Sequence, residues 1–126
     1  MSDFVNTIDL LGDELALSKM VEKTINEFND DVITVVGDYS FRSCTSLTSV
    51  NLPNVTSIGI EAFRYCSALT SVYLPATPPT IRSTTSFGYI NNACVFYIPT
   101  GSLSAYQSAT NWSTLTGQYS FVEEDR

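Results

Sequence analysis

The strongest constraint on the fold of this chain is an internal repeat of about 22 residues, a period typical of a solenoid. Shifting the sequence by that length places identical residues on one another throughout residues 37–75. The matches are Gly37 with Gly59, Phe41 with Phe63, Arg42 with Arg64, Cys44 with Cys66, Leu47 with Leu69, Val50 with Val72, Leu52 with Leu74, and Pro53 with Pro75. In a solenoid each coil buries its apolar edge against the next coil.

Each repeat carries the spacing LxxLxL, represented first by Leu47, Val50 and Leu52. This spacing predicts a short strand with apolar residues facing inward, paired in parallel with the same strand of the next coil. A degenerate third unit with about two extra residues follows, marked by Ile81, Phe87, Cys94, Phe96, Ile98 and Pro99. We therefore predict an α/β solenoid over residues 30–99, with two full coils and a degenerate third.

Such a short stack needs a cap at each end, and both flanks offer one. Residues 13–29 hold apolar side chains at helical spacing behind Asp13 as N-cap, which predicts an amphipathic capping helix. Residues 100–126 are expected to form a C-terminal helical cap and an acidic tail, with a helix over 102–109 and with Tyr106 and Trp112 closing the core. The whole chain is then one structural domain, preceded by residues 1–12 as an attachment or edge segment.

The residues needed for most catalytic or metal chemistry are missing. The sequence has no histidine, so neither a Ser-His-Asp nor a Cys-His arrangement can form. Its cysteines, Cys44, Cys66 and Cys94, follow the repeat and are interpreted as small buried apolar residues. We predict no enzyme activity, no cofactor and no metal site, although the oxygen-rich cluster Asn29, Asp30 and Asp31 leaves calcium open as an alternative to a solvated helix end.

The charge distribution argues against a nucleic-acid partner, and the N-terminal sequence argues against membrane insertion. The net charge of −7 sits mainly in residues 1–31, which hold eight acidic residues and two lysines. Nucleic-acid binding requires lysines and arginines that neutralise phosphates, so we exclude it. The first twenty residues contain Asp3, Asp9, Asp13 and Glu14 and no long apolar run, so we expect neither a signal peptide nor membrane insertion.

A candidate binding face follows from the alternation along the predicted strands. The outward positions are occupied by small polar residues, a valine and two tyrosines, namely Ser49, Asn51, Ser71, Tyr73, Val95 and Tyr97. Tyrosines on neighbouring strands present flat apolar area together with hydroxyl groups, which suits contacts with a protein or a glycan. The alternative is that Tyr73 and Tyr97 form only a cross-strand pair that stabilises the sheet.

Two stretches of the sequence resemble a known repeat family. The strings YSFRSCTSLTSVNLPNVTSIGIEAFRYCSALTSVYLP and FYIPTGSLSAYQSATNWS resemble the BspA-type leucine-rich repeats of bacterial surface proteins, and are similar to small genes in prophages of gut Firmicutes. The resemblance covers residues 33–115 and extends to the phenylalanine, cysteine and proline positions. It implies a non-enzymatic solenoid used for adhesion to host proteins or cell surfaces.

The resemblance and the missing export signal together suggest a virion protein of a phage. In that interpretation Phe4, Val5, Ile8, Leu10 and Leu11 attach the protein to the particle and could bundle as a symmetric homo-oligomer, and the solenoid is displayed outward. Head decoration, fibre and tail-associated adhesin are all open, with other virion proteins and a bacterial surface protein or glycan as partners. The alternative is a cytoplasmic protein-interaction module or inhibitor that uses the same face.

Overall fold

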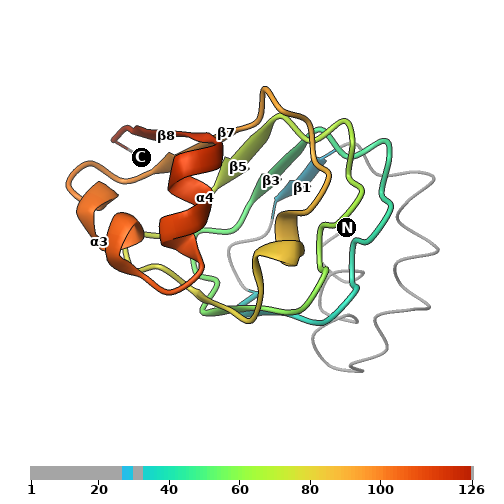
Figure 1. Ribbon diagram of the computed structural model, residues 1–126, viewed down its shortest axis with the longest axis horizontal. Coiled ribbons are helices and arrows are strands. Elements are labelled where there is room, and N and C mark those ends of the chain that lie inside the picture. The colour runs from blue at the N-terminus through green and yellow to red at the C-terminus, as the bar shows by residue number, and fades with distance from the viewer. Residues whose placement is uncertain (1–26, 30–32, 126) are drawn as a thin grey trace.

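The computed structural model describes residues 27–29 and 33–125, which form stacked coils with two parallel sheets (Figure 1). The larger sheet has the order β1-β3-β5-β7-β8 and the smaller one β2-β4-β6. The strands are β1 (Glu27–Asn29), β2 (Val35–Val36), β3 (Ser49–Asn51), β4 (Ser57–Ile58), β5 (Ser71–Tyr73), β6 (Thr80–Ile81), β7 (Val95–Ile98) and β8 (Ser120–Glu123). The helices are the short 3-10 helix η1 (Thr84–Phe87), α3 (Leu103–Ser108) and α4 (Trp112–Gln118). The predicted solenoid is confirmed in this part of the chain.

The register of the larger sheet follows the repeat. Val50 of β3 lies opposite Val72 of β5, its match in the shifted sequence, and Val72 lies opposite Phe96 of β7. The step from Val72 to Phe96 is longer than the step from Val50 to Val72, so the third unit holds the two extra residues that the sequence predicted. Each of these three residues is fully buried, while its neighbours on the strand are only half-buried. The predicted alternation of inward apolar and outward positions is therefore confirmed.

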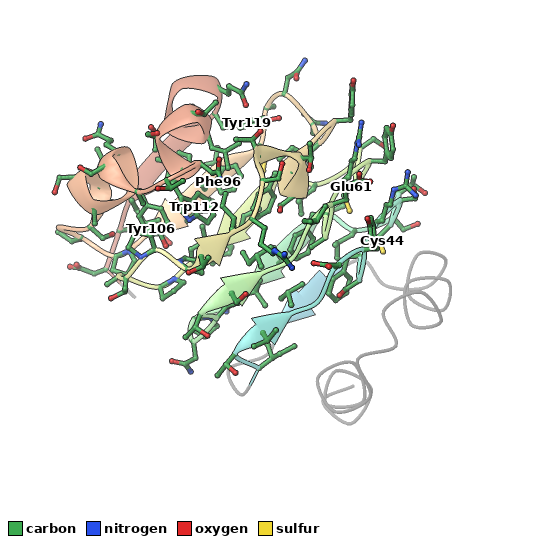
Figure 2. The ribbon with its side chains drawn as sticks, turned by 60° about the horizontal axis from the view of Figure 1, so that its bottom comes forward. Cys44, Glu61, Phe96, Tyr106, Trp112 and Tyr119 are labelled. Atoms are coloured by element: carbon green, nitrogen blue, oxygen red, sulfur yellow. The ribbon has the colours of Figure 1, made fainter. Side chains whose placement is uncertain are left out.

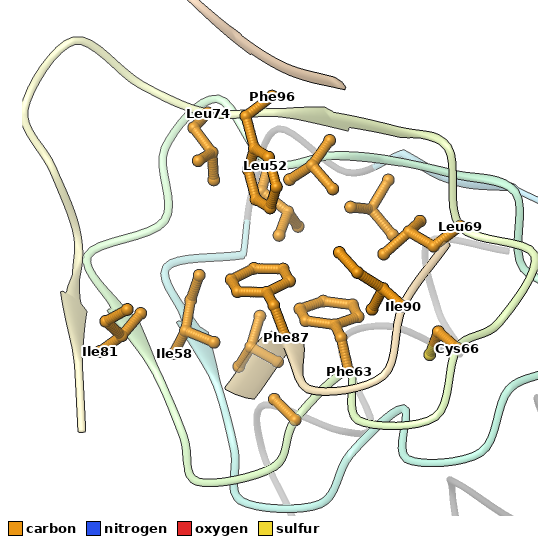
Figure 3. Packing of buried hydrophobic residues seen from close by; sticks show 14 of the residues in the cluster. Leu52, Ile58, Phe63, Cys66, Leu69, Leu74, Ile81, Phe87, Ile90 and Phe96 are labelled. Atoms are coloured by element: carbon orange, nitrogen blue, oxygen red, sulfur yellow. The ribbon is translucent and has the colours of Figure 1, made fainter. Parts of the chain in front are cut away.

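Aliphatic, aromatic and cysteine side chains that recur from coil to coil fill the core between the two sheets (Figure 3). The Phe63 ring lies between Phe41 and Phe87, with centroid distances of 5.2 and 5.3 Å and nearly parallel planes. Cys44, Cys66 and Cys94 are buried free thiols, as the sequence predicted. Equivalent side chains recur at equivalent places in successive coils. The packing between one pair of neighbouring coils is therefore repeated between the next pair.

The predicted N-terminal helix over residues 13–29 is wrong at its C-terminal end. Residues 27–29 form β1, which pairs in parallel with β3, and Phe28 lies opposite Val50. This pairing has the same offset as the sequence repeat, so the coils begin before residue 30. Ile25 and Phe28 match Leu47 and Val50 at this offset, and a spacing of three residues fits a helix face and the LxxL strand signature equally well. Residues 1–26 and 30–32 lie outside the described part of the chain.

The C-terminal end combines the predicted cap with a strand that the sequence did not predict. The helix expected over residues 102–109 is α3, and the side chains of Tyr106 and Trp112 are buried, as expected. Their polar atoms donate hydrogen bonds to backbone oxygens, Tyr106 Oη to Pro75 at 2.6 Å and Trp112 Nε1 to Pro79 at 2.7 Å. The helix α4 was not predicted. Residues 120–123 form β8, which pairs in parallel with β7, so this strand includes Glu123, the first residue of the expected acidic tail. Within the described residues the larger sheet thus holds five strands, more than the two full coils and degenerate third that were predicted.

Candidate functional site

The outward side of β3, β5 and β7, which we call the strand face, carries all the predicted binding residues. Its members are Ser49, Asn51, Ser71, Tyr73, Val95 and Tyr97, and each is half-buried. The parallel register places them in two rows across the strands. Ser49, Ser71 and Val95 form the first row, and Asn51, Tyr73 and Tyr97 form the second.

The two tyrosines of the strand face stack on each other. The rings of Tyr73 and Tyr97 stack with a centroid distance of 4.6 Å and an angle of 14° between their planes. Two stacked rings on a paired sheet lose little further conformational freedom when a partner binds them. The same contact also stabilises the sheet as a cross-strand pair, so both functions that the sequence suggested for these tyrosines fit the geometry.

The strand face extends one strand further than the sequence indicated. Val122 of β8 lies opposite Tyr97, and its side chain is 40% exposed. The second row therefore runs from Asn51 through both tyrosines to an exposed aliphatic residue. β3, β5 and β7 contain no charged residue, whereas the flanking strands β1 and β8 each contain a glutamate, Glu27 and Glu123. The three central strands are therefore polar and aromatic without a charge. A charge-depleted surface with aromatic side chains is typical of the centre of a protein–protein interface.

A second set of aromatic and charged side chains lies along the turns between the two sheets, which we call the loop edge. Glu61 forms an ion pair with Arg42 Nε at 3.0 Å and another with Arg64 Nη1 at 3.1 Å, and so connects neighbouring coils. Figure 2 shows Glu61 at the same edge of the molecule as Cys44. The Arg64 guanidinium lies 4.9 Å from the centre of the Tyr65 ring and 5.2 Å from that of Tyr89. Sequence reasoning missed this edge, although the match of Arg42 with Arg64 in the repeat pointed to it.

No catalytic arrangement emerges from the described residues. The three cysteines are buried, and burial raises the pKa of the Cys94 thiol to about 12, which keeps it protonated and unreactive at neutral pH. Within residues 27–29 and 33–125, no group of three cysteine or acidic side chains could hold a metal ion.

Some of the predicted residues lie outside the described part of the chain. These are Asp30 and Asp31 of the calcium candidate, and the attachment residues Phe4, Val5, Ile8, Leu10 and Leu11. No helix in the described part of the chain is long and apolar enough to cross a membrane.

Comparison with known proteins agrees with the repeat and extends it in both directions. The family model described as BspA type leucine rich repeat region matches residues 19–121 in six copies. The match includes β1 and nearly reaches the middle of β8, and so exceeds the range of residues 33–115 over which the sequence resembles the family. Comparison with individual curated proteins gives no significant match. Domains with this repeat are typically non-enzymatic, and they generally mediate protein binding or adhesion.

Proposed function

Because this chain belongs to the BspA-type leucine-rich repeat family, we propose that it is a non-enzymatic binding protein that holds a protein surface on its strand face. The observation that carries the proposal is the stacked pair Tyr73 and Tyr97, held on two paired strands that contain no charged residue. Tyrosine is enriched among the residues that dominate binding energies, since it combines a large apolar ring with a hydroxyl group. Ser71 adds a hydroxyl group on the same outward side of β5 as Tyr73.

We further propose that the protein is displayed on a phage particle, as a head decoration or fibre protein or as a tail-associated adhesin. The support is the likeness of its repeats to small prophage genes and the general use of such repeats in adhesion. Its partners would be other virion proteins at the N-terminal segment and a bacterial surface protein or glycan at the solenoid. The competing proposal is a cytoplasmic interaction module or inhibitor that uses the same strand face.

The location is tested on particles released from a strain that carries the gene and purified by density centrifugation. The virion proposal expects the protein in the particle fraction by mass spectrometry, at a constant ratio to the major capsid protein. Recovery only from the soluble lysate, in a complex with one host protein, would favour the cytoplasmic module.

The strand face is tested with fluorescently labelled full-length protein on a panel of gut Firmicutes cells, before and after protease treatment of the cells. We expect protease-sensitive binding that Tyr73→Ala weakens by about tenfold or more. The matched control is Tyr39→Ala, because Tyr39 is an exposed tyrosine outside the strand face. If Tyr73→Ala lowers the stability towards urea but leaves binding unchanged, the tyrosine pair stabilises the sheet and does not contact the partner.

The N-terminal segment is tested in the full-length chain by light scattering. If Phe4, Val5, Ile8, Leu10 and Leu11 assemble the protein, the double variant Ile8→Asp, Leu11→Asp should convert an oligomer to a monomer. A chain that is monomeric with and without these changes would remove self-assembly from the proposal.

A further inference from the structure

A hollow of about 570 Å³ opens beside η1, and it shares no residue with the strand face. The polar side chains that line it are Thr84, Thr85, Tyr89, Asn92, Gln118 and Tyr119. They come from η1, from the turn that follows it, and from the C-terminal end of α4, which packs against η1. Figure 2 shows Tyr119 beside α4 at this end of the molecule. The volume falls within the range of about 300 to 1,000 Å³ that is typical of small-molecule sites.

The lining of the hollow is polar but carries no charge. Among the described residues that line it, the hydrogen-bonding side chains are hydroxyls and amides. The Arg64 guanidinium lies close by, 5.2 Å from the centre of the Tyr89 ring, but it is already paired with Glu61 at 3.1 Å and does not itself line the hollow. The Asn92 and Gln118 side chains are exposed, and each amide can donate two hydrogen bonds and accept others. Thr85 Oγ1 donates to Ser83 Oγ at 3.0 Å, which leaves its oxygen as an acceptor for a ligand hydroxyl.

An exposed aromatic ring forms one wall of the hollow. Tyr89 is 67% exposed, yet its ring is held in place by stacking on Tyr65, with centroids 5.2 Å apart and 15° between the planes. The Arg64 guanidinium lies near both rings, and the Tyr65 amide donates to the Gly88 oxygen at 2.9 Å. The Tyr89 backbone adopts a φ of 58°, a left-handed conformation that is costly for a residue with a side chain. The fold thus fixes a large ring at the surface where it covers little of the protein itself.

From this combination we infer that the hollow is a binding site for a neutral saccharide. A sugar ring presents a flat face of C–H groups, which pack on an aromatic ring, and a rim of hydroxyl groups, which pair with amides and hydroxyls. Tyr89 supplies the platform, and Asn92 and Gln118 supply the polar partners from two segments of the chain. The hollow is open to solvent, so an inner unit of a longer glycan chain fits as well as a terminal one.

The test is an array that carries neutral glycans (mannan, β-glucan, galactan and N-acetylglucosamine oligomers) and acidic glycans (sialylated and sulfated oligosaccharides). Full-length protein should bind at least one neutral class, and Tyr89→Ala and Asn92→Ala should each weaken that binding by about tenfold or more. Tyr39→Ala is again the matched control, because Tyr39 is exposed and has a φ of 63° but does not line the hollow. Urea unfolding of each variant verifies that it is folded.

Three results would overturn the inference: no binding to any neutral glycan, binding to acidic glycans alone, or neutral-glycan binding that Tyr89→Ala leaves intact. Tyr73→Ala separates this site from the strand face. It should leave glycan binding unchanged, even where it abolishes protease-sensitive binding to cells.

Discussion

Phe121 stacks flat on Phe96, with a centroid distance of 4.7 Å and an angle of 5° between the ring planes. The two residues also lie opposite each other in the register of β7 and β8, so side-chain packing and backbone pairing favour the same alignment. Two helices separate these strands in the sequence, yet β8 continues the larger sheet as a further coil would. The C-terminal cap is therefore a strand of the solenoid together with helices that close its core.

Replacing Phe121 with alanine measures how much β8 contributes to the fold. Removing a fully buried phenylalanine costs about 3–5 kcal/mol, and since Phe121 is half-buried we expect a loss of about 2 kcal/mol in the free energy of unfolding. Urea denaturation measures this quantity. Val122→Ala is the control on the exposed face of the same strand and should change it by no more than about 0.5 kcal/mol. Equal effects of both substitutions would mean that β8 is not part of the cooperative unit.

Phe63→Ala tests the centre of the phenylalanine stack. This ring is fully buried between Phe41 and Phe87, so its removal leaves a cavity that two neighbouring coils line. We expect a loss of about 3–5 kcal/mol by chemical denaturation. Tyr65→Ala, two residues later but exposed, should cost much less. Near-wild-type stability of the Phe63 variant would contradict the packing of the coils described above.

The repeat made the middle of the fold predictable because it encodes the same packing more than once. Val50 and Val72 are each other's partners both in the sequence match and in the sheet, so the offset that reveals the repeat is also the strand register. The inward residues, the buried cysteines and the strand face followed from that single offset. The same offset also pairs Phe28 with Val50. The apolar residues of 13–28 fit the spacing of a helix as well, and the local sequence pattern alone does not distinguish a helix from a further repeat.

The ends and the hollow could not be predicted because their contacts do not follow the sequence period. β8 follows β7 only after α3 and α4, so Phe121 matches no earlier residue at the repeat offset. The hollow combines Tyr89 with Gln118 from α4, and only the folded arrangement of η1 against that helix brings them together. The extra residues of the third unit also move Tyr89 away from the position that matches Tyr65 at the repeat offset, which hides the stack of these two rings.

Glu123 should contribute to stability as a cap of α3. Its Oε2 accepts hydrogen bonds at 2.9 Å from the backbone amides of Gly101 and Leu103, which lie at the start of that helix. Amides at the first turn of a helix have no partner within the helix, and a carboxylate there is favoured by the helix dipole. We expect Glu123→Ala to cost about 1 kcal/mol in thermal or urea unfolding. Glu124→Ala removes the same charge without these bonds, and an equal loss in that variant would refute the capping role.

The free energy of unfolding should fall as the solution becomes alkaline, and Cys94→Ala should make this fall less steep. Burial raises the pKa of Cys94 from 9.0 to about 12, so between these pH values the unfolded chain has lost a proton that the folded chain keeps. The folded state is then disfavoured as pH rises, by about 1.4 kcal/mol per pH unit across that window.

Tyr106 adds a second alkaline dependence, because burial raises the pKa of its phenol above the ordinary value of 10.0. Tyr106→Phe also removes the hydrogen bond to Pro75, which lowers stability by a constant amount and leaves the slope due to Cys94 in place. Urea unfolding of the wild type and both variants, from neutral pH to about pH 11, separates the pH dependence of the free energy of unfolding from a loss that is the same at every pH. The decisive window is pH 9 to 10, which lies below the ordinary pKa of the tyrosine. If the free energy of unfolding falls equally steeply with pH in this window for the wild type and for Cys94→Ala, the burial of the thiol is contradicted.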